Sequence, residues 1–421
     1  MSEIDFLDDF AGSSLWSTVP AKRRFHYSKE LNAGMKESHR LALTMNGVID
    51  RSLDDAEGLQ TSDFEGYQIF EEGDLAFKLI DLENIKTSRV GLVPRRGIMS
   101  PAYIRLKASD PDESFTPFYY WYFYAAYKGN IFNGLGGGIR QSLNQTELLE
   151  FPVPEIDRAD QVEISEYLDE ENRRISDLIG KKKNFIKILA EKREAVICNA
   201  VTKGIIAGVR TKPSGEEWLR SVPAHWDIVP PTFLFRESKQ RALEGAQLLS
   251  ATQKYGVIPL SEFEALENRQ VTLAVANLDK RKHVEVGDFV ISMRSMDGGL
   301  ERARAVGSVR SSYTVLKPGE HVEGRYFGAL MKSSMFIQGL RLTSNFIRDG
   351  QDLNFSHVRE LKLPLPPFDE QVAIADHIER ETSRIDRLVK ATQQSIKLLH
   401  EHRTALITAA VTGKIDVRNA A

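Results

Sequence analysis

The chain contains one long segment twice, and this duplication limits the folds available to it. Residues 161–205 align without gaps onto residues 371–415, 210 positions further on, with 18 identities in 45 positions. Gln161 and Gln371 head the two copies, and an Ala-Val-Thr run closes each of them, at 200–202 and 410–412. An internal repeat of this length predicts an architecture in which one structural unit is built twice.

Within each copy, apolar residues recur at seven-residue steps, which favours two long coiled-coil helices. The recurring residues are Leu168, Ile175, Leu189 and Val196 in the first copy and Ile378, Ile385, Leu399 and Leu406 in the second. Leu178 and Phe185 in the first copy and Leu388 in the second are predicted to complete the seam. Neither helix buries its apolar stripe alone, so each is the expected partner of the other. Lys182 and its equivalent Thr392 make the seam polar at one step, which either fixes the register or is a tolerated gap.

Each helix follows a domain of mixed α and β character, and the two domains share short matching segments. The matches pair 16–20 with 219–223, 73–77 with 287–291, 97–107 with 307–317, and the helix-like runs 118–127 with 326–338. Both domains close on alternating proline segments, 151–154 and 363–366, where proline excludes helix and predicts an extended exit. Since the stretches between these matches differ, we predict one frame that holds two different contents.

The composition is that of a folded chain with two or three domains. The chain is 42% hydrophobic and 27% charged, as expected for a protein with a buried core. Its one cysteine, Cys198, excludes an internal disulfide and fits a reducing cytoplasm. We expect no signal peptide and no membrane span, because the acidic first residues have no basic region and no apolar run reaches about 18 residues. The net charge of −3 hides a difference, with 16 Lys+Arg against 22 Asp+Glu in 1–153 and 20 against 18 in 213–365.

No motif predicts that the chain carries its own chemistry. Residues 132–136 have the Phe-x-Gly-x-Gly spacing of a loop that binds S-adenosylmethionine, but they follow an aromatic helix-like run instead of the required strand. Residues 365–368 (Leu-Pro-Pro-Phe) have a leucine where an amino-methylation motif needs a polar residue. The histidines show no metal-ligand spacing, and Cys198 is expected to be a packing residue. By elimination, we expect a binding and scaffolding component without catalytic residues, cofactor or metal.

The duplicated layout resembles the specificity subunit of type I restriction-modification systems. Two segments carry the resemblance: Leu-Pro-Leu-Pro-Pro-Phe-Asp-Glu-Gln-Val-Ala-Ile at 363–374 and Ile-Thr-Ala-Ala-Val-Thr-Gly-Lys-Ile-Asp at 407–416. Family members commonly read Pro-Leu-Pro-Pro followed by Glu-Gln at the first place and Ala-Val-Thr-Gly-Lys-Ile at the second. The first copy departs from this pattern, because 155–160 is two residues longer and Lys203-Gly204 inverts the order of Gly413-Lys414.

This resemblance implies an α+β fold in which two mixed α/β target recognition domains, 1–153 and 211–365, alternate with two long helices, 154–210 and 366–421. The helices would form an antiparallel coiled coil in a pseudo-two-fold repeat. Each domain would read one half of a bipartite asymmetric target in double-stranded DNA. The helices would set the spacer and dock two modification subunits, which methylate adenine.

The chemistry would then belong to the partner subunits. S-adenosylmethionine is expected on the modification subunits, and ATP and Mg are expected where restriction subunits translocate and cleave DNA. Two alternatives remain: a coiled-coil scaffold without sequence-specific DNA reading, and a self-sufficient methyltransferase or nuclease. The first leaves unexplained why two unlike domains share one frame, and the second needs a cofactor fold.

Candidate DNA contacts follow from residue type and position. Base reading requires long polar side chains that reach a groove from a rigid platform, and phosphate contacts require cations. The predicted base readers are Lys78, Arg140 and Gln141 in the first domain and Arg294, Asn345 and Arg348 in the second. The predicted phosphate contacts are Lys22, Arg23, Arg24, Arg302 and Arg304. The competing interpretation for each is a solvated surface charge or a structural ion pair.

Overall fold

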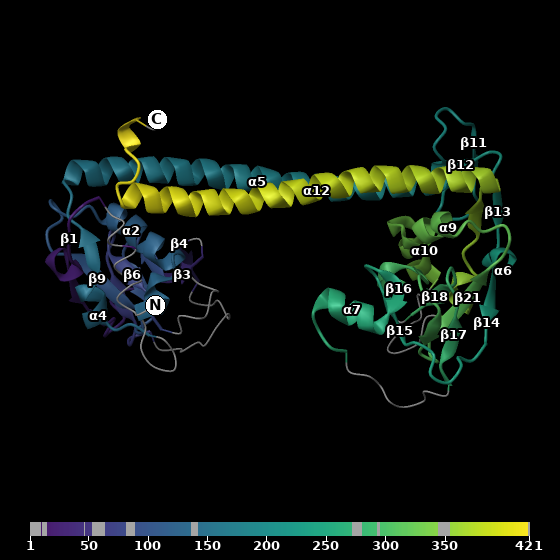
Figure 1. The fold of residues 1–421 in the computed structure, drawn as a ribbon, viewed down its shortest axis with the longest axis horizontal. Helices are drawn as coiled ribbons and strands as arrows, with labels where there is room; N and C mark the ends of the chain where they lie inside the picture. The colour runs from purple at the N-terminus through teal and green to yellow at the C-terminus, as the bar shows by residue number, and fades with distance from the viewer. Residues whose placement is uncertain are drawn as a thin grey trace. The chain divides into compact units, whose positions relative to one another are not determined.

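The protein divides into two compact units, each of which joins one domain to a part of both long helices (Figure 1). The computed structural model describes residues 10, 15–45, 47–52, 64–80, 89–135, 142–271, 280–292, 295–343 and 354–419. Unit 1 comprises Met1–Lys182 and Gln393–Ala421, and unit 2 comprises Lys183–Thr392. Each long helix therefore begins in one unit and ends in the other.

The two long helices are α5 (Arg158–Lys203) and α12 (Phe368–Val411), and their segments run antiparallel within each unit. In unit 2, Arg193 forms an ion pair with Asp386. In unit 1, Arg403 Nη2 donates to Ser176 Oγ at 3.0 Å. The 210-residue repeat relates Ser176 to Asp386 and Arg193 to Arg403, so both units use the same helix register.

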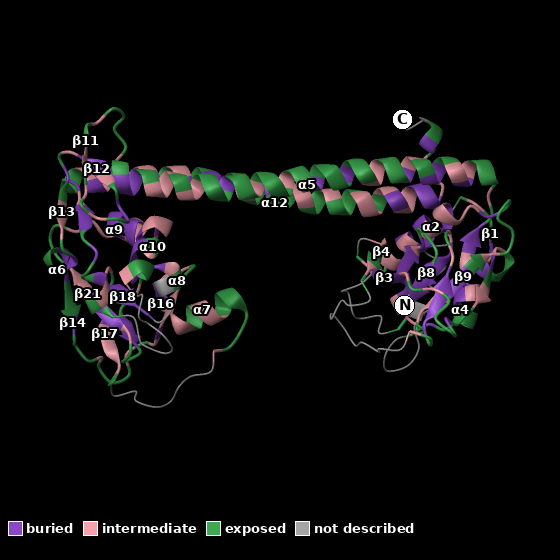
Figure 2. Ribbon diagram, turned by 180° about the vertical axis from the view of Figure 1, so that it is seen from behind, coloured by how far each residue is buried: buried purple, intermediate pink, exposed green. Residues whose placement is uncertain are grey.

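The buried seam confirms the seven-residue step and corrects its second position. Ile179 is buried at 5% exposure, whereas Leu178 (42%), Phe185 (42%) and Leu388 (43%), which we predicted to complete the seam, are exposed. The seam continues four residues after Ile175 rather than three, so that Ile179 and then the half-buried Ile186 face the partner helix. Figure 2 shows buried positions recurring between exposed ones along both helices. Buried Thr392 donates its hydroxyl to the Leu388 carbonyl at 2.7 Å, which satisfies it at the polar step of the seam.

The domain of unit 1 contains an antiparallel sheet, with strand order β2-β9-β6-β7, and a mixed sheet, with order β4-β3-β8-β5, beside an aromatic helix. Its elements are β1 (Thr18–Pro20), η1 (Ala21–Arg23), β2 (Phe25–Ser28), β3 (Arg40–Thr44), β4 (Gly47–Arg51), β5 (Gln68–Phe70), β6 (Leu75–Phe77), β7 (Val90–Leu92), β8 (Gly97–Met99), β9 (Ile104–Ala108), α2 (Thr116–Lys128), α3 (Ile131–Leu135), α4 (Gln145–Glu150) and β10 (Pro152–Pro154). The chain ends with η3 (Val417–Asn419) after α12.

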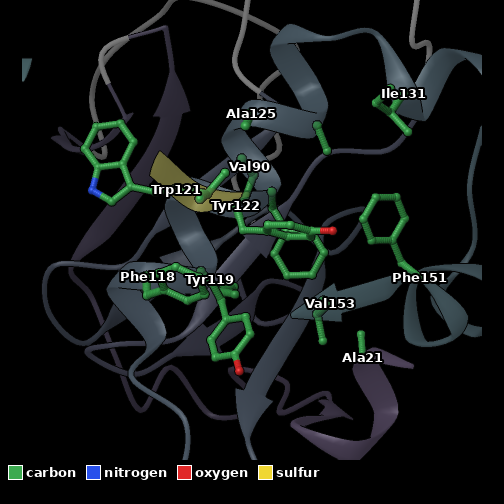
Figure 3. Packing of buried hydrophobic residues seen from close by; sticks show 14 of the residues in the cluster. Ala21, Val90, Phe118, Tyr119, Trp121, Tyr122, Ala125, Ile131, Phe151 and Val153 are labelled. Carbon is green, nitrogen blue, oxygen red and sulfur yellow. The ribbon is translucent and has the colours of Figure 1, made fainter. Parts of the chain in front are cut away.

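The core of unit 1 is built on α2, whose aromatic side chains fill the space beside the sheet. Figure 3 shows Phe118, Tyr119 and Tyr122 of this helix packed with Phe151 and Val153 from the exit segment. The hydroxyl groups of Tyr119 and Tyr122 donate to the carbonyls of Pro154 and Pro152, at 3.2 and 3.1 Å. These bonds tie the exit strand to the helix. Burial raises the pKa of Tyr119 to about 12, so its hydroxyl remains a donor.

The domain of unit 2 repeats the first sheet, with order β14-β21-β18-β19, and its pairs β15–β16 and β17–β20 repeat the second sheet, joined by the Leu248–Ser308 bridge. Its elements are β11 (Thr211–Pro213), β12 (Ser221–Pro223), β13 (Asp227–Val229), α6 (Pro231–Leu234), β14 (Phe235–Ser238), β15 (Leu249–Thr252), β16 (Gly256–Pro259), α7 (Leu260–Glu267), β17 (Lys282–Val284), β18 (Phe289–Ile291), α8 (Ser295–Gly298), β19 (Glu301–Arg302), β20 (Gly307–Val309), β21 (Thr314–Pro318), α9 (Gly324–Lys332), α10 (Ser334–Thr343), α11 (Phe355–Val358) and β22 (Leu363–Leu365). The helix-like run predicted at 326–338 is two helices, because Ser333 between them is extended and its hydroxyl donates to the Leu330 carbonyl.

Most of the predicted frame is confirmed, but one match is wrong. The Gly-Asp turns lead into β6 and β18, and both proline segments form extended strands, β10 and β22. The exit strand of unit 1 pairs with 18–20, and that of unit 2 pairs with 227–229. Segment 16–20 therefore corresponds to 226–230, with Trp16 equivalent to Trp226, and not to 219–223. Residues 222–223 have the same Val-Pro sequence as residues 19–20, but they lie in the β11–β12 hairpin.

Candidate nucleic-acid interface

The glutamine that heads each repeat fixes its domain to the long helix. Gln161 is fully buried at the start of α5, where its Oε1 accepts from the Phe115 backbone N–H at 2.7 Å. Its Nε2 donates to the carbonyls of Glu113 (3.0 Å) and Ile156 (2.9 Å). Phe115 is the N-cap residue of α2, so one side chain joins a domain helix, the exit segment and the long helix.

Gln371 repeats this joint in unit 2 with the corresponding atoms. Its Oε1 accepts from the backbone N–H of Glu323, the N-cap residue of α9, at 2.9 Å. Its Nε2 donates to the carbonyls of His321 and Pro366, both at 3.0 Å. The sequence showed that the two glutamines are identical, but their role as joints needed the structure, because their partners lie outside the duplicated segment.

The Ala-Val-Thr ends of the helices pack into the domain cores. Val411 is fully buried in the core of unit 1, and Val201 is fully buried in the core of unit 2. The hydroxyl of fully buried Tyr326 donates to the Val201 carbonyl at 3.0 Å. Each domain is thus held by the start of one long helix and the end of the other.

Glycine terminates both helices against a tryptophan. Gly204 and Gly413 have φ of +72° and +76°, the left-handed conformation that favours glycine after a helix. A Cβ on Gly413 would come within 2.9 Å of the Trp16 indole, and one on Gly204 within 3.2 Å of Trp226. The inverted order of Lys203-Gly204 and Gly413-Lys414 therefore moves the glycine by one residue and keeps its packing against a tryptophan.

The structure places several of the predicted phosphate contacts in or beside ion pairs. Lys22 pairs with Glu150 at 2.5 Å, and both groups are exposed. Arg24 pairs with Glu113 and Glu155, and its side chain is only 11% exposed. Arg23 is exposed and has no ion pair in the part of the chain that the structure describes. Lys78 follows β6 and is half-buried, with its backbone N–H bonded to the Arg89 carbonyl at 2.9 Å.

Arg302 and Arg304 line a cavity of unit 2. The other predicted contacts lie outside the described residues: Arg140, Gln141, Arg294, Asn345 and Arg348. All eleven DNA contacts therefore stay predictions.

A duplicated pair of exposed apolar residues lies on the long helices. Leu178 and Leu388 are related by the repeat, as are Ile188 and Leu398, and the latter two are 50% and 53% exposed. In heptad notation they take positions g and c, which lie on the same flank of a helix pair. Because Ser176 lies opposite Arg403, Leu398 lies about one helical turn from Leu178 in unit 1. By the same register, Ile188 lies about one turn from Leu388 in unit 2.

The glycine-rich segment does not have the context of an S-adenosylmethionine loop. Phe132 lies in α3, is fully buried and follows α2, whereas the loop must follow a strand. Phe132 packs at ring-centroid distances of 6.5 Å from Phe77 and 5.5 Å from Phe151. Across the described ranges, no group of three acidic, histidine or cysteine side chains is arranged to hold a metal ion. Nor does any helix in those ranges have the length and hydropathy needed to cross a membrane.

Comparison with known proteins identifies the fold. No protein-family model matches the chain. The chain is 22% identical over 313 residues to the type I restriction enzyme MjaX specificity subunit of Methanocaldococcus jannaschii, covering 72% of this chain and 69% of that protein. A solved chain from work on complex assembly and conformational transition of the type I restriction-modification system matches with a TM-score of 0.68. The chain has the fold of type I specificity subunits.

A second solved structure agrees with this identification. The HsdS subunit from Thermoanaerobacter tengcongensis matches with a TM-score of 0.55 at 12% identity, covering 95% of this chain and 97% of that one. The first solved chain is likewise 12% identical and covers 95% of this chain and 98% of its own length. The resemblance to specificity subunits in the sequence motifs is therefore confirmed, although few side chains are shared.

Proposed function

We propose that this protein is the sequence-specificity subunit of a type I restriction-modification complex and that each domain reads one half of a bipartite asymmetric DNA target. The observation that carries this proposal is the contrast between a repeated frame and unlike contents. The sheets β2-β9-β6-β7 and β14-β21-β18-β19 have the same order, yet unit 1 continues with the one helix α2 where unit 2 has α9 and α10, and Leu92 of unit 1 takes the place of Arg302 in unit 2. Two unlike readers on one frame recognise two unlike half-sites, whereas two identical readers recognise a palindrome.

The helices would set the spacer between the half-sites. At about 1.5 Å per residue, one turn added to α5 and α12 lengthens the helices by about 5.4 Å, or one to two base pairs of DNA. The joints at Gln161 and Gln371 would transmit this length to the domains, because each of them orders the start of a long helix against a domain helix.

The duplicated exposed pairs would dock two copies of one partner. Leu178 with Leu398 and Ile188 with Leu388 present the same residue positions twice, and exposed apolar patches on coiled-coil flanks commonly mark interfaces. We assign them to two modification subunits, which would bind S-adenosylmethionine and methylate adenine. Restriction subunits would add ATP- and Mg-dependent translocation and cleavage in the cytoplasm, and this chain would remain non-catalytic.

Co-expression with a modification subunit tests the specificity role. Mapping of methylated adenines should find one split asymmetric motif, and methylation should disappear when this chain is omitted. Replacing residues 211–365 with those of a relative should change one half of the motif and leave the other half and the spacer intact. Equal methylation without this chain, or a change in both halves, would refute the proposal. A coiled-coil scaffold would give complexes but no motif.

The docking assignment has its own test. Leu178→Asp combined with Leu398→Asp should reduce the number of bound modification subunits from two to one, as measured by native mass spectrometry. Ile188→Asp combined with Leu388→Asp should do the same at the other site. Leu266→Asp, on the exposed face of α7 and away from the long helices, provides a control at 52% exposure that should retain both partners. Retention of two partners by both double variants would exclude these pairs as the docking surface.

A further inference from the structure

Unit 2 contains a cavity of about 460 Å³ whose lining includes six cations and one carboxylate, and we call it the basic cavity. It lies between α5, the β15–β16 hairpin, β19 with Arg304, and α9. Its charged lining residues are Arg193, Lys254, Arg302, Arg304, Arg325, Lys332 and Glu301.

Some of these cations are neutralised within unit 2. Lys332 Nζ lies 2.8 Å from both carboxylate oxygens of buried Glu301. Arg325 pairs with Glu323, Asp376 and Glu379, which together raise the pKa of its guanidinium. These groups stiffen the wall of the cavity without adding much positive potential to it.

Further around the wall, Arg193 pairs with Asp386 and Lys254 pairs with Glu267 at 3.4 Å. Arg302 and Arg304 differ from all of these, since neither has a carboxylate partner in the part of the chain that the structure describes. Both guanidinium groups therefore face the basic cavity without an ion pair of their own, although the Glu301 carboxylate, which pairs with Lys332, also attracts Arg304.

Arg302 is held in a position that favours an anion. Its guanidinium lies against Gly324, the first residue of α9, where an added Cβ would approach Nε to 2.7 Å. The Nε atom is buried and finds no acceptor among the described residues. A helix N-terminus also carries a partial positive charge. The Glu323 carboxylate offsets part of this charge, because it caps the helix at the Tyr326 N–H, but it does not reach Arg302. A buried donor without an acceptor is costly, and a bound anion would satisfy it.

The corresponding position in unit 1 is apolar. Strand β7 occupies the place of β19, and Leu92 lies opposite Leu75 where Arg302 lies opposite Phe289. The arginine is therefore no part of the shared frame. It is specific to unit 2, as expected for a contact made beside only one half-site.

We propose that the basic cavity binds a backbone phosphate of duplex DNA beside the half-site read by the second domain. This inference rests on the proposed DNA-reading function and adds a defined contact to it. Two guanidinium groups without an ion pair can donate to the oxygens of a phosphodiester in a forked geometry. Exposed Arg304 leaves one side of the cavity open to a long polymer.

The test compares Arg302→Ala with Arg304→Ala, singly and combined, in the full chain bound to its modification subunit. Affinity should be measured for target and non-target duplexes over a range of salt concentrations. Loss of a phosphate contact should weaken both duplexes by a similar factor, roughly five- to tenfold, and reduce the salt slope by about 0.9. Arg210→Ala removes an exposed arginine of unit 2 that does not line the basic cavity, and it should leave both quantities unchanged. Arg304→Glu alone carries the test if Arg302 variants fold poorly.

Each other outcome overturns the inference. Unchanged affinity and salt slope in the folded double variant would exclude the contact. A shift in the methylated sequence, without a uniform loss of affinity, would show base reading instead. Thermal stabilisation by inorganic phosphate or ATP that requires both arginines, with DNA affinity unaffected by them, would assign the cavity to a small phosphorylated ligand. If the wild-type complex showed no preference for any sequence, the proposed function would be wrong. If the wild type preferred its target and the double variant kept the same DNA affinity and salt slope, only this inference would be wrong.

Discussion

The two units agree at their joints and in the pairing of their strands, and they differ in the helices and side chains that this frame carries. Both place a buried glutamine between a domain helix and a long helix, and both end a long helix with a glycine against a tryptophan. Between these points, unit 1 fills its core with the aromatic residues of one continuous helix, whereas unit 2 divides the same region between α9 and α10. Residues that attach each domain to the long helices are thus repeated, whereas residues that fill each domain differ.

The difference extends to charge. Asp386 neutralises Arg193 in unit 2, but the equivalent of Asp386 in unit 1 is Ser176, so Arg403 has a hydroxyl where its counterpart has a carboxylate. Leu92 in unit 1 takes the place of Arg302 in unit 2. A repeated joint with unlike surfaces is the arrangement that the proposed function requires, because the two domains would attach to the helices in the same way and bind different half-sites.

The largest expected effect comes from breaking a joint. Gln161→Leu should destabilise unit 1 by about 3–5 kcal/mol, because it leaves the Phe115 N–H and the carbonyls of Glu113 and Ile156 buried and unsatisfied, each at about 1–3 kcal/mol. Gln371→Leu should cost unit 2 a similar amount. Denaturant unfolding, with hydrogen exchange to separate the units, measures both.

The exposed glutamine of α12 at position 394 supplies a matched control. Gln394→Leu replaces the same residue type on a long helix, and its effect should remain within about 0.5 kcal/mol. A large cost at one joint and a small cost at the other would break the comparison, because it would show that only one glutamine has a structural role.

A smaller effect separates the seam from the flank. Ile179→Ala should cost about 2–3 kcal/mol, since a buried side chain is removed from between the helices. Leu178→Ala, one residue earlier and largely exposed, should cost less than about 1 kcal/mol but weaken binding of a partner. Thermal unfolding gives the first quantity and titration with the modification subunit gives the second. Equal destabilisation by the two variants would restore the seam that we first predicted.

Leu178 and Ile179 show why the sequence predicts that the helices exist better than it predicts which side of each helix is buried. Apolar residues stand both three and four residues after Ile175, so periodicity alone does not select between Leu178 and Ile179. A surface that binds a partner contains the same apolar residue types as a buried seam. The duplication reveals the helices, the proline exits and the shared sheet, because these recur at a constant or nearly constant offset. It did not reveal that the β3–β4 and β15–β16 hairpins are equivalent, where the offset changes from 208 residues at Thr44 and Thr252 to 209 residues at Gly47 and Gly256.

The candidate site was predictable to a lesser degree. Arg302 and Arg304 were selected by residue type, but Gly324, which makes room for Arg302, is distant in sequence and carries no motif. Arg24 was selected on the same grounds and lies in two ion pairs. Charge in a sequence does not reveal whether a carboxylate will fold against it, so pairing had to come from the structure.

The helix ends offer a graded comparison. Gly413→Ala should cost about 2 kcal/mol, because an L-residue in the left-handed conformation costs about 1 kcal/mol or more and its Cβ would press on the Trp16 indole. Gly204→Ala should cost less, since its contacts with Trp226 and the Glu370 carboxylate are longer and the carboxylate can move. Gly208→Ala provides the control, with φ of +75° and nothing within 4 Å, and isolates the backbone part. The order 413, 204, 208 in melting temperature checks the shared cap, and a different order would show that the two ends pack differently.

The smallest expected effect concerns Cys198 on α5 and its equivalent on α12, Thr408. Burial raises the pKa of the Cys198 thiol, and its contacts with Glu194 at 3.1 Å and Ser334 at 3.5 Å place it under the start of α10. A raised pKa means less thiolate at a given pH, so alkylation by iodoacetamide should be slow, and its rate should keep rising above about pH 9.5, where the rate for a free thiol levels off. Thr408→Cys in a Cys198→Ser background places a thiol in an open groove of unit 1, and it should react roughly three- to tenfold faster at pH 7.5. Equal rates and equal pH profiles would contradict the inference that α10 covers this position in unit 2, whereas the described residues of unit 1 leave it open.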